Sequence, residues 1–289
     1  MQRRRLGRTG HESSLAILGG AAFWDSSPEE AERGFRMALD AGVNHLDIAP
    51  QYGAAEDVIG PLIPSVRDRL FVGCKTMRKS PDGVRDQLET SLAKLRCDRF
   101  DLYQAHAVTD LDVLDERAGA IETMLSARDE GLTRFVGVTG HDLGAPSTHL
   151  EALRRWDLDT VMFPVYPRVW ADEKYRADAE ALLAECTQRD VGVMAIKAVA
   201  WRPWGDQQPT AGTWYQPFAD EASVSRGVRF ALSTSGVHAF CTPGDLGVLP
   251  LALRAAEAYV PMSHDEHRGA LTAVGNDEVI FPLVEKARR

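Results

Sequence analysis

The chain has 289 residues, 44% hydrophobic and 26% charged, a composition ordinary for a globular protein with a sizeable core. Its formal charge of −9 argues against a nucleic-acid groove or a polybasic membrane face. The basic first residues are not followed by an apolar stretch long enough for a signal peptide or a membrane span. Cys74, Cys97, Cys186 and Cys241 lie far apart without a CxxC spacing, which favours reduced thiols in a cytoplasmic enzyme over a disulfide framework or a zinc site.

Local turn and cap signals predict the first elements. Residues 3–14 contain the turn-forming Gly7 and Gly10 and predict a small β-hairpin that closes the bottom of the fold. Residues 27–42 predict a helix, because Ser27 is suited to the N-cap, Pro28 to the first helical position and Glu30 to a capping box. Residues 80–95 repeat this pattern with Ser80 and Pro81.

Short apolar runs alternate with amphipathic stretches along the rest of the chain. The runs show no clean period-2 alternation, which indicates strands buried on both faces of a parallel sheet. They cover residues 15–20, 43–49, 69–76, 100–106, 134–140, 160–166, 192–198 and 237–242. Further helices are expected near 54–63, 115–130, 146–155, 174–188, 219–233 and 244–258.

Eight strands that are each followed by a helix predict an α/β protein of the (β/α)8 TIM-barrel type, with the N-terminal hairpin closing the bottom. A doubly wound sheet is less consistent with the sequence, because no GxGxxG motif follows any of the strands. The chain contains neither a low-complexity linker nor a shift in composition. We therefore expect one domain over residues 1–289.

Polar side chains end three consecutive predicted strands. Asp47 ends the second strand, Lys75 the third and His106 the fourth, and Tyr52 follows in the loop after Asp47. Each residue alone has an ordinary explanation, such as a turn cap, a solvated strand end or packing. Together they are expected at the carboxyl ends of barrel strands, where chemistry takes place. A phenol beside an ammonium, backed by a carboxylate and a neutral imidazole, can deliver a proton to a carbonyl oxygen.

The segment GVNHLDIAPQYGAAEDVIG resembles the signature of the aldo-keto reductases. The matching positions are Gly42, Asp47, Ala49, Tyr52, Gly53, Glu56 and Gly60. The runs FVGCKT and DLYQAH resemble the family's strands that carry the catalytic lysine and histidine, and the similarity extends over about residues 3–260. The resemblance implies a TIM barrel that binds a nicotinamide cofactor, with catalytic Asp47, Tyr52, Lys75 and His106. In this scheme Asp47 holds Lys75, and Lys75 lowers the pKa of Tyr52.

The same resemblance implies cofactor-binding positions after later strands. The family commonly has Ser-Asn after the fifth strand, where this chain has Thr139 and Gly140, and His141 is expected to supply the missing hydrogen bond. A glutamine expected in the sixth strand is Met162. The residue that stacks on nicotinamide corresponds to Ile196, and Lys197 follows it as a contact for the cofactor or the substrate, or as a solvated strand end.

The segment after the eighth strand bears on the choice between NADP and NAD. Members of the family that prefer NADPH place Lys or Arg there, whereas this chain has Pro243, Gly244 and Asp245, with Arg254 further on. The family habit favours NADP, but an anionic Asp245 would repel the 2′-phosphate and suit the free hydroxyl of NAD. Both cofactors therefore stay open.

The expected substrate is a small carbonyl compound or alcohol, and the part of the site that holds it is expected to be aromatic. Phe23 and Trp24 follow the first strand, and a long loop after the seventh carries the others: Trp201, Trp204, Trp214 and Tyr215. A loop of this length in a compact domain is often a functional lid. These rings can equally pack on one another.

The sequence therefore predicts a nicotinamide-dependent oxidoreductase that interconverts a carbonyl and an alcohol, with Tyr52 as general acid and base. One alternative is a Schiff-base lyase with Lys75 or Lys197 as the nucleophile, and another is a non-catalytic barrel that senses a cofactor. A metallohydrolase built on His106, His141 and Asp47 is the weakest alternative, because the chain has no His-x-His pair. No metal, nucleic-acid or membrane partner is expected, and the oligomeric state is left open.

Overall fold

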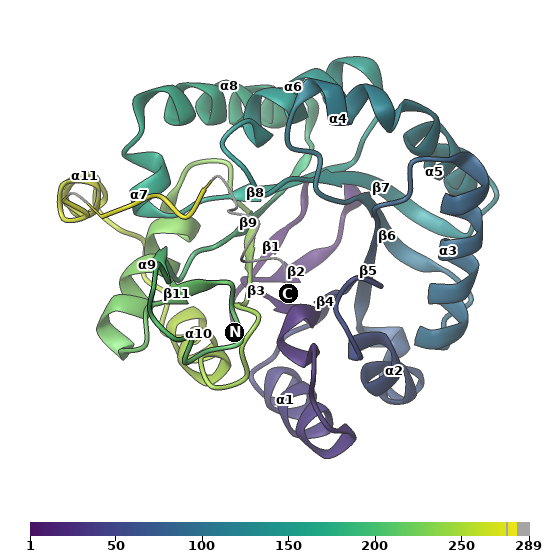
Figure 1. The fold of residues 1–289 in the computed structure, drawn as a ribbon, viewed down its shortest axis with the longest axis horizontal. Helices are drawn as coiled ribbons and strands as arrows, with labels where there is room; N and C mark the ends of the chain where they lie inside the picture. Colours follow the sequence, from purple (N-terminus) through teal and green to yellow (C-terminus); the bar gives the residue numbers. More distant parts are fainter. Residues whose placement is uncertain (276, 282–289) are drawn as a thin grey trace.

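The computed structural model describes residues 1–275 and 277–281, and its strands close into a parallel barrel ringed by helices (Figure 1). The barrel strands are β3 (Ala16–Gly19), β4 (His45–Asp47), β5 (Phe71–Thr76), β6 (Phe100–Ala105), β7 (Thr133–Thr139), β8 (Thr160–Pro164), β9 (Gly192–Ile196) and β12 (Ala239–Cys241). Each pairs in parallel with its neighbours in chain order, and β12 closes the barrel against β3. The predicted (β/α)8 class is confirmed. The predicted boundary at residue 289 lies outside the described residues.

The helices lie mostly on the outside of the barrel (Figure 1). They are α1 (Pro28–Asp40), α2 (Ala55–Ile59), α3 (Pro81–Leu95), α4 (Leu111–Glu116), α5 (Ala118–Asp129), α6 (Ala145–Arg155), α7 (Pro167–Trp170), α8 (Glu173–Arg189), α9 (Glu221–Ser233), α10 (Leu249–Glu257) and α11 (His264–Thr272). The capping box of Ser27 and Glu30 is formed as predicted. None of these described helices is long and apolar enough to cross a membrane.

Three of the predicted helices differ from those observed. The stretch 54–63 becomes α2 and then a 3-10 helix, Gly60–Ser65, in which Pro61 and Pro64 cannot donate α-helical hydrogen bonds. The stretch 115–130 is divided into α4 and α5. The helix expected from residue 244 starts only at Leu249, because the preceding residues form the loop that leaves β12.

The N-terminal hairpin covers one end of the barrel, as predicted. It pairs β1 (Arg3–Arg5) with β2 (Glu12–Ser14) in antiparallel register. Leu6 is fully buried and joins the apolar cluster inside the barrel. The ring of His11 stacks on that of Phe71, the first residue of β5, at a centroid distance of 4.4 Å. The hairpin therefore lies at the amino ends of the strands, at the other end of the barrel from Asp47 and Lys75.

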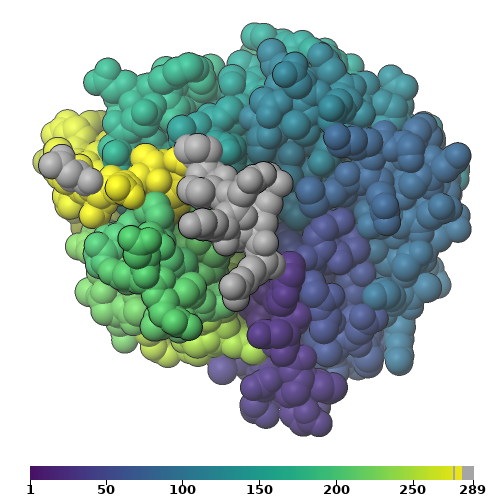
Figure 2. All heavy atoms as spheres, in the orientation of Figure 1, coloured from purple at the N-terminus to yellow at the C-terminus, as the bar shows by residue number. Residues whose placement is uncertain are grey.

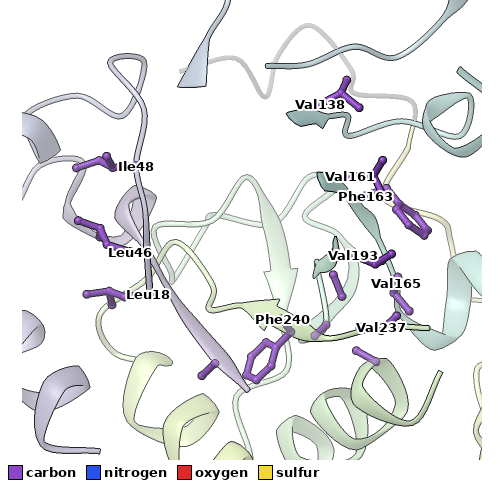
Figure 3. Close-up of a cluster of buried hydrophobic side chains, with 14 of the residues drawn as sticks. Leu18, Leu46, Ile48, Val138, Val161, Phe163, Val165, Val193, Val237 and Phe240 are labelled. Carbon is purple, nitrogen blue, oxygen red and sulfur yellow. The ribbon is translucent and has the colours of Figure 1, made fainter. Parts of the chain in front are cut away.

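Two apolar layers explain why the strands do not alternate between apolar and polar residues. One layer fills the space between the strands and the helices and contains Leu18, Leu46, Val161 and Phe240 (Figure 3). The other lies inside the barrel and contains Leu6, Ile17, Phe71, Leu102, Met162 and Met194. Successive residues of a strand point to opposite faces. The inward positions of β5 and β6 therefore run from Phe71 and Leu102 to Lys75 and Gln104.

The tryptophan-rich segment is more ordered than the single long loop that the sequence predicts. It forms an antiparallel hairpin of β10 (Ala200–Pro203) and β11 (Tyr215–Pro217). The indole of Trp204 donates from Nε1 to the carbonyl of Thr213 at 2.7 Å, which ties the two ends of the connecting loop together. The segment lies on the molecular surface beside the yellow C-terminal part of the chain (Figure 2), where the Nε1 of Trp201 is 3.1 Å from Oδ2 of Asp277.

Candidate active site

A buried ion pair lies at the carboxyl ends of β4 and β5. The carboxylate of Asp47 accepts from the ammonium of Lys75, and both side chains are buried. Gln104 donates from Nε2 to Oδ1 of Asp47 at 3.1 Å, and Sγ of Cys241 is 3.7 Å from Oδ2 of Asp47. Removing one partner of such a pair costs roughly 3–5 kcal/mol, because the other charge stays buried. Loss of either side chain is therefore expected to destabilise the fold.

The phenol of Tyr52 contacts this ion pair. Nζ of Lys75 donates to the hydroxyl of Tyr52 at 3.1 Å. Burial raises the pKa of Tyr52 to about 12, and the nearby Lys75 opposes this rise without reversing it. Lys75 therefore lowers the pKa of the phenol as predicted, but burial raises it by more. Burial pulls the pKa of Lys75 down, but Asp47 and then Tyr52 outweigh it, so Lys75 stays charged.

Two imidazoles complete the polar group. Nε2 of His106 is 3.0 Å from Nε2 of His141, and the ring of His106 meets that of Tyr52 edge-on at 5.8 Å. Burial lowers the pKa of both histidines well below the usual range, and neighbouring charged groups add to the effect. Because two neutral rings share this contact, one nitrogen donates and the other accepts.

The end of β7 presents hydrogen-bonding atoms without partners. Oγ1 of Thr139 and Nδ1 of His141 are buried and have no hydrogen-bond partner within the described chain. Thr139 pairs in register with Met162, which belongs to the inner layer and lines the cavity beside Tyr52. A Cβ on Gly140 would lie 2.3 Å from the carbonyl oxygen of Val108, so a side chain does not fit there. Its predicted contact with the cofactor stays a prediction.

Lys197 follows β9 and lines the same cavity as Tyr52, His141 and Ile196. Its Nζ is 5.0 Å from the ring centroids of both Trp214 and Tyr215. Burial lowers its pKa to about 8. No carboxylate in the described part of the chain forms a salt bridge with it.

The segment after β12 is arranged differently from the prediction. Pro243 and Gly244 line the cavity. Asp245 is bound within the protein: its Oδ2 accepts from the amide of Gly212 at 2.7 Å and its Oδ1 from that of Val248 at 2.9 Å. It thus links the β10–β11 loop to the start of α10. Arg254 lies in the last turn of α10, and its guanidinium is 3.9 Å from the carboxylate of Glu221.

The six aromatic residues predicted to bind substrate separate into two groups. Tyr215 lines the cavity and Trp214 flanks Lys197. Trp24 is 45% exposed and its carbonyl accepts from the amide of Ala54, beside the Tyr52 loop. The other three, Phe23, Trp201 and Trp204, do not line the cavity among the described residues.

Each of these three side chains packs against protein, and their predicted substrate contacts stay predictions. Phe23 is fully buried, and a Cβ on Gly34 of α1 would lie 3.0 Å from its ring. The ring of Trp201 stacks on Phe218 at 6.0 Å. Trp204 is bound within its own hairpin loop.

Sequence reasoning missed two residues of the site, Gln104 and Cys241. Gln104 lies on β6 two residues before His106, which directly follows the strand, so the period of two in a strand predicts that both face inward. That spacing is a signal that could have identified Gln104. Cys241 ends the eighth barrel strand, and its cavity position matches that of the other strand-end residues. Among the described residues, no three His, Cys, Asp or Glu side chains are placed to hold a metal ion.

The fold is a (β/α)8 barrel with polar side chains at the carboxyl ends of its strands, and comparison with known proteins shows its family. The sequence profile described as "Aldo/keto reductase family" matches residues 16–209. The chain therefore belongs to the aldo/keto reductase family. An aldo-keto reductase from Bacillus halodurans, in its holo form, has a similar fold, with a TM-score of 0.72 at 20% identity over 100% of both chains.

Curated relatives are distant. The chain is 29% identical to the aldo-keto reductase YhdN of Bacillus subtilis over 50% of this chain and 48% of that protein. It is 25% identical to the L-galactose dehydrogenase of Arabidopsis thaliana over 77% of this chain and 72% of that protein. The chain thus spans about half the length of the first curated relatives it matches.

Proposed function

We propose that the protein is an NAD(P)-dependent oxidoreductase that interconverts a carbonyl compound and an alcohol, with Tyr52 as the general acid and base. The observation that carries the proposal is the chain of contacts from Asp47 through Lys75 to the hydroxyl of Tyr52. These contacts lead to a cavity at the carboxyl ends of the barrel strands, where enzymes of this fold have their active sites.

The residues around the cavity fit a nicotinamide cofactor. A carboxamide needs both donors and acceptors, and Thr139 Oγ1 and His141 Nδ1 are buried without partners in residues 1–275 and 277–281. Gly244 keeps the cavity wall free of a side chain, since a Cβ there would lie 3.1 Å from that of Ala21. When bound, the cofactor would supply or accept the hydride.

The protein's own groups would manage the proton. In reduction, the hydroxyl of Tyr52 donates its proton to the carbonyl oxygen, and the ammonium of Lys75 stabilises the phenolate that is left. Asp47 keeps Lys75 charged and fixed, with Gln104 holding the second carboxylate oxygen. Neutral His106 lies beside the phenol and can orient the substrate oxygen.

The central test is Tyr52→Phe, which removes the hydroxyl and keeps the ring. We expect kcat for aldehyde reduction to fall by about a hundredfold or more, whereas the Kd for NADH and NADPH changes by no more than a few-fold. Cofactor fluorescence measures binding, and absorbance at the nicotinamide band measures turnover. A variant that keeps most of the wild-type kcat would remove Tyr52 from this role. Cofactor binding without any turnover in the wild type would instead favour the sensing barrel.

A Schiff-base lyase that uses Lys197 is the second candidate. The lowered pKa of about 8 favours it, because a partly neutral amine is a better nucleophile. Lys75 does not suit this role, since its raised pKa keeps it protonated. Trapping with borohydride, followed by mass spectrometry, would find the substrate attached to Lys197 if the lyase is correct. An unmodified Lys197 after trapping would exclude it.

We propose a small-molecule substrate, a single functional domain over residues 1–289 and a cytoplasmic location. The four cysteines Cys74, Cys97, Cys186 and Cys241 are all free, which supports a reducing compartment. Neither NAD nor NADP is excluded by the contacts of Asp245. Comparing the Kd of both cofactors decides between them.

A further inference from the structure

We propose that Arg117 is a positioning residue for His106, because its guanidinium holds the backbone that carries this imidazole. Arg117 bonds the carbonyl of His106, so it acts through that residue rather than on a substrate. The inference rests on the proposed function, in which His106 orients the substrate oxygen. It goes further, because it names a residue behind the site on which the place of that ring depends.

Arg117 is a buried arginine at the junction of α4 and α5, and only 4% of its surface is exposed. None of the salt bridges within residues 1–275 and 277–281 includes it. Its Nε has no hydrogen-bond partner in the same part of the chain. Arginines are rarely buried without an ion-pair partner, because the guanidinium loses its hydration. The fold therefore keeps a costly group at this position.

The guanidinium contacts carbonyl oxygens at the ends of two barrel strands. Its Nη1 donates to the carbonyl of His106, which directly follows β6, and to that of Thr76, the last residue of β5, at 3.4 Å. The amide of His106 donates to the same carbonyl of Thr76 at 2.8 Å. Thr76 comes directly after Lys75. One guanidinium thus fastens the backbone beside both Lys75 and His106.

The backbone after His106 is strained. The φ of Ala107 is +58°, in the left-handed region that favours glycine. Val108 then returns to the barrel, since its amide donates to the carbonyl of Thr139 at 2.9 Å. Strain of this kind persists only where surrounding contacts hold it. The bond from Arg117 is such a contact, because the carbonyl of His106 belongs to the peptide unit that enters Ala107.

The charge of Arg117 also favours the protonation state that the proposed function needs. Burial is the main reason that the pKa of His106 lies well below its usual range, and His141, Lys75, Arg117 and Lys197 lower it further. A neutral imidazole keeps one donor and one acceptor nitrogen, whereas a protonated ring has donors only. Arg117 therefore supports both the place and the neutral state of the ring.

A double-mutant cycle between Arg117 and His106 tests the inference, with benzaldehyde as the substrate. We expect Arg117→Met to lower kcat/KM about tenfold in the wild type but less than about twofold in His106→Gln, because nothing is left to position there. Arg117→Lys should recover most of the loss, since it keeps a donating cation. Arg155→Met is the control, because Arg155 ties α6 to Asp115 of α4 on the exposed side of these helices.

Equal losses in both backgrounds would overturn the inference and leave Arg117 a purely structural residue. Wild-type kcat/KM in Arg117→Met would overturn it as well. Circular dichroism and urea unfolding show whether each variant folds. If Arg117→Met does not fold, Arg117→Gln takes its place in the cycle with the same expectation, because the amide is shorter and uncharged.

Magnetic resonance of the histidine side chains separates this inference from the proposed reductase function. The imidazole ¹⁵N resonances of His106 are assigned by their loss in His106→Gln. We expect them to shift in Arg117→Met, to return in Arg117→Lys and to stay in place in Arg155→Met. This result supports the inference even if the wild type turns over no aldehyde and the reductase function fails. Resonances of His106 that do not move in Arg117→Met would contradict it.

Discussion

Nε2 of His106 lies 3.0 Å from Nε2 of His141, although these residues are 35 positions apart and follow different strands. Both rings are neutral, so the proton on the shared contact belongs to one of them and fixes the tautomer of the other. His141 can therefore act as a positioning residue that determines which nitrogen of His106 is available to a substrate oxygen.

Replacing His141 tests this relationship. We expect His141→Leu to lower kcat by about tenfold, because His106 loses the partner that sets its tautomer. His141→Asn should be less affected, since an amide can still donate or accept. Steady-state kinetics and cofactor fluorescence would be measured for both variants. Equal kcat in His141→Leu and the wild type would show that the contact does not orient His106.

The pKa of Tyr52 predicts different pH profiles for the two directions of the reaction, flat for reduction and rising for oxidation. With a pKa of about 12, the phenol stays protonated in reduction up to high pH. Alcohol oxidation needs the phenolate. At pH values below the pKa, its fraction rises about tenfold for each unit by which the pH increases. We therefore expect kcat/KM for oxidation to climb from pH 7 to 10. The measurement uses neutral substrates and the variant Lys197→Met, so that the titration of Lys197 does not contribute to the profile. A plateau near pH 8 in that variant would contradict the prediction.

Asp245 connects the β10–β11 hairpin with α10 through the amides of Gly212 and Val248. Asp245→Asn removes the negative charge and keeps one oxygen as an acceptor. If this carboxylate repels a 2′-phosphate, the Kd for NADPH should tighten by about tenfold while the Kd for NADH changes little. The comparison uses nicotinamide fluorescence at constant salt. A wild-type preference for NADPH of about a hundredfold would show that other groups balance Asp245.

His149 on α6 predicts acid sensitivity of the fold. The ring is fully buried, and burial lowers its pKa from 6.5 to about 3. Between these values the unfolded chain binds the proton and the folded chain does not, so stability falls as the pH falls from 6.5 towards 3. The slope from this residue is about 1.4 kcal/mol per pH unit.

Urea unfolding of His149→Gln at pH 7 and pH 5 measures this slope. We expect the variant to be less stable at pH 7 but to lose less free energy of unfolding between the two pH values than the wild type does. His264→Gln is the control, because His264 is exposed at the start of α11. An unchanged pH dependence in His149→Gln would assign the acid sensitivity to other groups.

Much of this architecture could be predicted from local sequence. The order of eight apolar runs and amphipathic helices predicts the barrel, because each strand buried on two faces must be covered by the helix that follows it. Caps such as Ser27 with Glu30 depend on neighbours within one turn, so they are visible in the sequence. The strand-end positions of Asp47, Lys75 and His106 follow from the same pattern.

Other features were decided only by the tertiary structure, because they depend on burial and on partners from distant segments of the chain. Lys75 contacts Tyr52 and lowers its pKa as expected, but burial, which local sequence does not show, raises that pKa by more. Phe23 and Trp204 follow strands as binding residues would, yet they pack inside the protein. Asp245 is bound by amides that are 33 and 3 residues away in the chain. Aromatic rings and carboxylates suit a core or a turn as well as a ligand, so their role is fixed only when the chain closes around them.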